Sequence, residues 1–116
     1  IRKCKSNGIF LSVVSSDLPD TLLLELKEWN LENIFNEIVT DVDDKLVAVQ
    51  KIIKDNNLSL EDTCFIGDSN HEIDVAKKVG IKSIAVTWGF TSGRKLKAEN
   101  PDYIFNNVEE LETIIL

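Results

Sequence analysis

The chain has 116 residues, of which 43% are hydrophobic and 28% charged, a composition typical of one globular domain. Its formal net charge is −7 and its basic residues are scattered, which argues against broad electrostatic attraction to nucleic acid or anionic lipid. No apolar run approaches the ~18 residues needed to span a membrane and no signal peptide is recognisable, so we expect a cytoplasmic protein. The spacing of Cys4 and Cys64 suggests neither a disulfide framework nor a zinc site.

The first part of the chain predicts a helix and then a buried strand. Residues 1–7 are typical of the end of a helix that Asn7-Gly8 stops. The nearly continuous apolar run 9–14, IFLSVV, predicts a strand buried on both faces. Ser15 and Ser16 follow directly, so a parallel sheet would place their hydroxyl groups at the carboxyl end of that strand.

A second strand is expected at residues 37–40, between two helices. The first helix begins near Pro19, ends at about Trp29, and has an apolar stripe formed by Leu22, Leu23 and Leu26. After the strand comes an acidic loop, residues 41–44, and then Lys45. The second helix, residues 46–54, has apolar residues at helical spacing, namely Leu46, Val49, Ile52 and Ile53.

The stretch 63–80, TCFIGDSNHEIDVAKKVG, predicts a short strand, a Gly-Asp turn and an amphipathic helix. Cys64 is expected to be buried in that strand. Asp68 would then lie at the carboxyl end of the strand, where a carboxylate can hold a hard cation such as Mg²⁺. Glu72 follows one helical turn later, so its carboxylate can point to the same corner.

The rest of the chain continues the alternation of strands and helices. Strands are expected at residues 82–86 and 103–105, a loop at 87–90, and helices at 92–99 and 108–116. This alternation is typical of a parallel sheet covered by helices on both faces. We therefore predict one α/β domain over residues 1–116, built as a Rossmann-like three-layer sandwich.

Three kinds of chemical group thus follow three successive strands: a hydroxyl at Ser15 or Ser16, a cation at Lys45, and a carboxylate at Asp68 supported by Glu72. Phosphoryl transfer needs such groups, because catalysis consists mostly of positioning and of stabilising charge on the phosphoryl oxygens. The sequence therefore points to a phosphate site at one edge of the sheet.

In these motifs the chain resembles the haloacid dehalogenase-like hydrolases, in particular their phosphoglycolate phosphatase-like branch. The run 9–16 is similar to the family's second motif, Lys45 to its third, and Phe65-Ile66-Gly67-Asp68-Ser69 with Glu72 to its fourth. The run 84–90 and Pro101-Asp102-Tyr103 extend the likeness. The resemblance implies a phosphate-binding hydroxyl at Ser15, with Ser16 as second choice, a charge-neutralising Lys45, and Mg²⁺ held by Asp68 and Glu72. It leaves open whether Glu72 reaches the metal directly or through water.

The family's nucleophile, an Asp in a DxD motif after the first strand, has no counterpart here. In this fold that strand lies between those that carry Ser15 and Asp68, so we expect the sheet to lack its centre and the chain to be the carboxyl-terminal part of a phosphatase. No cap domain is visible. The resemblance implies hydrolysis of a small phosphorylated metabolite through an aspartyl-phosphate, completed by a missing amino-terminal segment.

Alternatives remain at this stage. Asp41-Val42-Asp43 is literally DxD, but the other motifs do not follow it in the required order, so a solvated acidic loop is the favoured interpretation. A response-regulator receiver domain would need an acidic pair where Ser15 and Ser16 stand. A non-catalytic interaction module derived from a phosphatase is the other alternative.

Overall fold

The computed structural model describes residues 2–31, 33–87 and 93–115. In chain order its elements are α1 (Arg2–Ser6), β1 (Ser12–Val14), α2 (Pro19–Glu28), β2 (Glu37–Val39), α3 (Lys45–Asp55), the 3-10 turn η1 (Leu60–Asp62), β3 (Cys64–Gly67), α4 (Asn70–Val79), β4 (Lys82–Val86), α5 (Gly93–Ala98), β5 (Tyr103–Phe105) and α6 (Val108–Ile115). The predicted alternation of strands and helices is confirmed. Residues 88–90 of the predicted loop lie outside the described residues.

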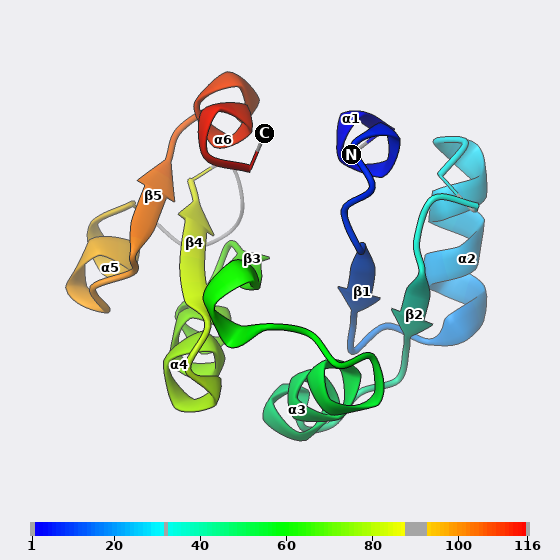
Figure 1. Ribbon diagram of the computed structural model, residues 1–116, viewed down its shortest axis with the longest axis horizontal. Helices are drawn as coiled ribbons and strands as arrows, with labels where there is room; N and C mark the ends of the chain where they lie inside the picture. The colour runs from blue at the N-terminus through cyan, green and yellow to red at the C-terminus, as the bar shows by residue number, and fades with distance from the viewer. Residues whose placement is uncertain (1, 32, 88–92, 116) are drawn as a thin grey trace.

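All described strands pair in parallel, but they form two sheets (Figure 1). β1 pairs with β2, with Val14 opposite Val39. β4 lies between β3 and β5, with Gly67 opposite Ala85 and Val86 opposite Phe105. No ladder among the described residues joins β1 to β3, so each of these strands has one unpaired edge. This division agrees with the expected absence of a central strand.

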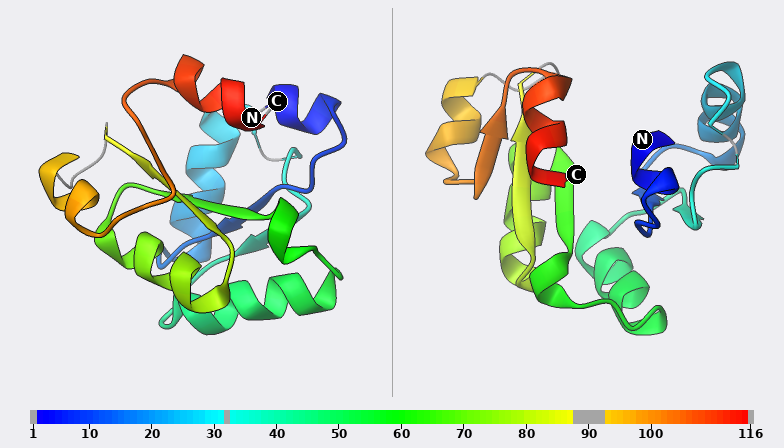
Figure 2. Two further views of the ribbon diagram at one scale, coloured as in Figure 1. Left: turned by 60° about the vertical axis from the view of Figure 1, so that its left-hand side comes forward. Right: turned by 45° about the horizontal axis from the view of Figure 1, so that its top comes forward.

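The two sheets share one apolar core beneath them. Val49 of α3 and Val75, Ala76 and Ile81 of the α4 region form its buried centre. Val14 from β1 and Phe65 from β3 both pack against that centre, so α3 and α4 bridge the two sheets. Figures 1 and 2 show α3 and α4 on one side of the strands and α1 and α6 on the other, which gives the predicted three layers.

The strand predicted at residues 9–14 is shorter than expected. β1 begins only at Ser12, because the N–H of Leu11 donates to the side chain of Asn36, at Oδ1 (2.8 Å), and not to a backbone carbonyl of β2. The Leu11 carbonyl accepts from Asn36 N (2.7 Å) and, at 3.4 Å, from Glu37 N at the start of β2. In the apolar run 9–14, residues 9–11 therefore form a loop and residues 12–14 form β1.

The expected burial of Cys64 is wrong. The residue is exposed, because β3 is an edge strand whose side chains alternate between exposed and half-buried positions. The thiol nevertheless loses part of its water: this burial raises the pKa of Cys64, nearby Cys4 adds to the rise, and Lys82 opposes it.

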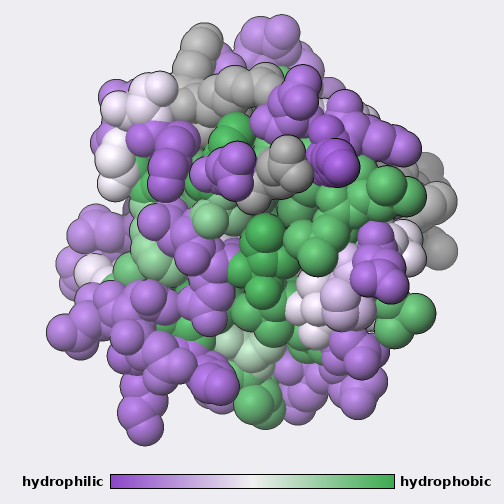
Figure 3. Space-filling view, turned by 90° about the vertical axis from the view of Figure 1, so that its right-hand side faces the viewer, coloured by the Kyte–Doolittle hydropathy of each residue, from purple (hydrophilic) through white to green (hydrophobic). Residues whose placement is uncertain are grey.

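The apolar stripe of α2 is also narrower than predicted. Leu22 and Leu26 are buried as expected, whereas Leu23 is 47% exposed. Further exposed apolar residues of this region are Leu18, Leu24 and Trp29. Figure 3 views the molecule from the side that carries α2 and shows apolar surface there.

Candidate phosphate site at the strand ends

Ser15 directly follows β1, where the sequence predicted it. It is half-buried, and its N–H donates to Val39 O (2.9 Å), which continues the pairing of β1 with β2 by one residue. Its Oγ accepts a hydrogen bond from Asp17 N (3.0 Å). Ser16 is exposed. The local geometry therefore favours Ser15 over Ser16 as the positioned hydroxyl.

Lys45 is the first residue of α3. Asp44 caps this helix, because its Oδ1 accepts from the N–H groups of Leu46 (3.0 Å) and Val47 (3.4 Å). A lysine at this position is electrostatically unfavourable for the helix, since the amino-terminal end of a helix is already positive. An ammonium group added to a positive helix end suits the binding of an anion.

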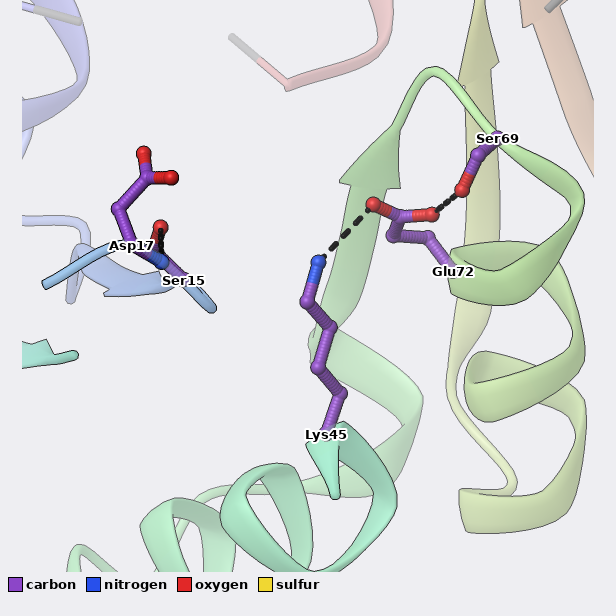
Figure 4. Close-up of polar contacts among 5 residues, drawn as sticks. All are labelled: Ser15, Asp17, Lys45, Ser69 and Glu72. Atoms are coloured by element: carbon purple, nitrogen blue, oxygen red, sulfur yellow. Dashed lines mark hydrogen bonds and ion pairs between the residues drawn. The ribbon is translucent and has the colours of Figure 1, made fainter. Parts of the chain in front are cut away.

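Glu72 is the counter-ion of Lys45. Lys45 Nζ lies 3.2 Å from Glu72 Oε1, and the two side chains are only 18% and 12% exposed. The other carboxylate oxygen, Oε2, accepts a hydrogen bond from Ser69 Oγ (Figure 4). Glu72 thus joins the first turns of α3 and α4 and fixes the position of the ammonium group.

The Glu72 side chain fits there because residue 67 is glycine. A Cβ atom on Gly67 would lie against Cβ and Cγ of Glu72, closer than real Cβ atoms approach other atoms. This is a close approach of backbone and side chain that glycine alone permits without rearrangement. Glycine at position 67 is therefore explained by the space that the Glu72 side chain occupies.

Asp68 occupies the bend between β3 and α4 and is half-buried. No described residue pairs with its carboxylate. Beside it, Oδ1 of Asn70 is buried without a hydrogen-bond partner among the described residues. These oxygen atoms suit a hard cation, and Mg²⁺ usually takes one or two carboxylates together with water and phosphate oxygens. Within the described residues, no group of three or more His, Cys, Asp or Glu side chains could hold a metal by itself.

The structure brings some of the predicted site residues into contact and leaves others apart. Lys45 and Glu72 form an ion pair, whereas Ser15 makes no described contact with either of them. Figure 4 shows Ser15 apart from Lys45, on the side of β1. β1, which precedes Ser15, and β3, which precedes Asp68, each have an unpaired edge.

Two loops at the strand ends are held together by their backbones. Asp41 N donates to Asp17 O (2.7 Å), and Val42 N donates to Ser15 O (3.1 Å). Asp41 itself has φ 53°, in the left-handed region. Asp41 and Asp43 are exposed, which agrees with the interpretation of Asp41-Val42-Asp43 as an acidic surface loop.

Ser69 is a site residue that the sequence reasoning did not assign to the site. The signal was present, because Ser69 and Glu72 have the Ser-x-x-Glu spacing of a capping box. In the usual box each side chain bonds backbone N–H groups, whereas here the two side chains bond each other. His71 lies in the first turn of α4 and is exposed.

Comparisons with known proteins bear on the family of this chain. A family model described as "Haloacid dehalogenase-like hydrolase" matches residues 1–86. Pyrophosphatase PpaX of Bacillus mycoides is 27% identical over 120 residues, which cover 99% of this chain and 56% of that protein. Phosphoglycolate phosphatase of Synechococcus elongatus is 23% identical over 113 residues, 96% of this chain and 53% of that protein.

A solved structure gives the same result for the fold. The crystal structure of a predicted phosphatase from Clostridium acetobutylicum has a TM-score of 0.87 and 28% identity to this chain, and the match covers 98% of this chain and 55% of that one. The chain therefore spans about half the length of the curated relatives it matches. None of the helices in the described part of the chain is long and apolar enough to cross a membrane.

Proposed function

Because the chain belongs to the haloacid dehalogenase-like hydrolases, we propose that it is the carboxyl-terminal part of a magnesium-dependent phosphatase that hydrolyses a small phosphate monoester. The observation that carries this proposal is the Lys45–Glu72 ion pair, which fixes a cation at the strand ends where two helices begin. Anions are favoured at such helix ends. The names of the relatives, a pyrophosphatase and a phosphoglycolate phosphatase, support the reaction class.

In this proposal Ser15 and Lys45 bind the phosphoryl group. The Ser15 hydroxyl donates to one phosphoryl oxygen, with Ser16 as the second choice for this role. Lys45 places its positive charge against the oxygens on which negative charge develops during transfer. Loss of one such charge-stabilising group typically lowers the rate by about 10²–10³-fold.

Asp68 is the proposed metal ligand, and Glu72 supports it. The half-buried carboxylate without a described partner and the buried, unpaired Oδ1 of Asn70 fit a hard cation. Bound Mg²⁺ supplies Lewis-acid stabilisation of phosphoryl oxygens. Since both oxygens of Glu72 already have partners, Lys45 and Ser69, a contact of Glu72 with the metal through water fits this arrangement.

The nucleophile is proposed to come from a segment outside this chain. A strand placed between β1 and β3 would pair with both unpaired edges and would put its carboxyl end between Ser15 and Lys45. An Asp at that position would attack phosphorus and displace the alkoxide of the ester, which leaves as the alcohol after taking up a proton from solvent. Water would then attack the aspartyl-phosphate, release inorganic phosphate and restore the carboxylate. The greater length of the relatives leaves room for such a segment.

The proposal is tested by Asp68→Asn in the full-length protein. We expect activity on a generic phosphate ester to fall by about 10²-fold or more and the Mg²⁺ concentration for half-maximal activation to rise. Asp74→Asn is the matched control, because Asp74 lies on α4, the helix that follows Asp68, and forms an ion pair with Lys78 on the surface. Unchanged Mg²⁺ activation in Asp68→Asn would count against the assigned role.

Wild-type protein without any turnover would favour the non-catalytic interaction module.

A further inference from the structure

Asp17 lies beside the proposed phosphate-binding hydroxyl, in a backbone position that is held from two sides. Its N–H donates to Ser15 Oγ (3.0 Å), and its carbonyl accepts from Asp41 N (2.7 Å). Figure 4 shows the Asp17 carboxylate and the Ser15 hydroxyl projecting to the same side of the loop. The side chain is exposed, so its charge faces whatever approaches Ser15.

Acidic residues outnumber basic ones in the two loops next to Ser15. The loop after β1, residues 15–18, and the loop after β2, residues 40–44, contain four aspartates and no basic residue. Lys45 follows these loops, but its ammonium group is already paired with Glu72. None of the described basic side chains pairs with Asp17. The rim on the β1 side of the site is therefore negative.

Resting on the proposed function, we infer that Asp17 is a specificity determinant that disfavours substrates whose leaving group carries negative charge. The preferred substrates are then phosphate monoesters with a neutral or a positively charged leaving group. A phosphoryl group bound to the Ser15 hydroxyl would lie next to Asp17, whose backbone nitrogen is 3.0 Å from Ser15 Oγ, and its leaving group would then come within reach of the Asp17 charge. At such a distance one like charge near the surface changes the relative rate by about three- to tenfold, and added salt weakens the effect.

The test compares kcat/KM of the full-length protein for four probes: ethanolamine phosphate, p-nitrophenyl phosphate, phosphoglycolate and inorganic pyrophosphate. We expect the cationic and neutral leaving groups to be preferred over the two anionic ones. Asp17→Asn keeps the size and the backbone N–H. It should raise the ratio of kcat/KM for phosphoglycolate to that for p-nitrophenyl phosphate by about three- to tenfold at low salt, and less at high salt.

Asp62→Asn is the control, because it removes the same charge at the opposite end of β3, where η1 ends. It should leave the ratio unchanged. A wild-type preference for anionic leaving groups would overturn the inference, as would an Asp17→Asn variant that changes all four substrates equally. In both cases turnover of the esters would still support the proposed phosphatase function, whereas failure of that function would appear as no turnover of any ester.

Discussion

Glu72 shows how closely the residues at the site depend on one another. Its carboxylate bonds Lys45 through one oxygen and Ser69 through the other, and its Cβ and Cγ occupy the space above Gly67. Gly67 therefore affects the position of Lys45 indirectly. Because residue 67 has no side chain, Glu72 can lie against β3, where its carboxylate bonds Lys45.

Gly67→Ala should destabilise the protein by about 1–3 kcal/mol, the usual cost of forcing extra atoms into a packed position. The added methyl group would press on Cβ of Glu72, which is fixed to α4 and cannot swing away. Urea unfolding of the full-length protein measures this cost. The matched control is Gly8→Ala, where nothing lies within 4 Å of the new Cβ atom and only the positive φ of 74° opposes the substitution. Because that backbone strain itself costs about 1–2 kcal/mol, Gly8→Ala serves to measure strain without contact. Unchanged stability of Gly67→Ala would show that contact with Glu72 is unimportant.

The sequence predicted the positions of the site residues better than their contacts. Ser15, Lys45, Asp68 and Glu72 lie at the predicted strand and helix ends, because apolar periodicity and turn residues fix where elements stop. The direct bond between Ser69 and Glu72 could not be read from the sequence, since a capping box ordinarily satisfies backbone groups. The exposure of Cys64 was missed because an apolar strand looks the same at the edge and in the centre of a sheet.

At the scale of elements, Ser83 and Asp102 join the beginnings of β4 and β5. Ser83 is only 1% exposed, and its N–H donates to Asp102 Oδ2 (2.8 Å), as does its hydroxyl (3.3 Å). In return, Asp102 N donates to Ser83 Oγ (2.9 Å). These bonds satisfy buried polar groups at the point where the chain enters the last strand.

Asp102→Ala should therefore lower the free energy of unfolding by about 1–3 kcal/mol, because it leaves a buried N–H and a buried hydroxyl without an acceptor. Thermal or urea unfolding of the full-length protein measures the loss. Asp102→Asn retains a side-chain oxygen that can accept from Ser83 N and should cost clearly less. If alanine and asparagine cost the same, the acceptor is not what stabilises this junction.

At this scale the sequence predicted element type well and element length less well. The bounds of α3 and β4 agree with their apolar periodicity to within a residue. The run IFLSVV was predicted as one strand, but the side chain of Asn36 takes the backbone N–H of Leu11 and delays the strand to Ser12. A competing bond from a residue 25 positions away is invisible to a local pattern.

For the whole molecule, the division into two sheets predicts that the 116-residue chain alone does not hydrolyse phosphate esters. The residues proposed to bind phosphate lie on either side of the unpaired edges of β1 and β3, where the strand proposed to carry the nucleophile would pair. The measurement is turnover of p-nitrophenyl phosphate with Mg²⁺ by the isolated chain. The full-length protein is the positive control. Clear turnover by the isolated chain that Asp43→Asn abolishes would show that the acidic loop supplies the nucleophile after all.

The pairing of Lys45 with Glu72 also bears on how tightly any anion can be held. An ammonium group at the start of α3 without an opposing carboxylate would be an unsatisfied positive charge, and an incoming dianion would bind it strongly and leave slowly. Here the charge already has a partner, so under the proposed function a phosphoryl group would compete with Glu72 for Lys45 Nζ instead of meeting an unpaired ammonium group. Such competition would weaken retention of the product and would thereby suit repeated turnover.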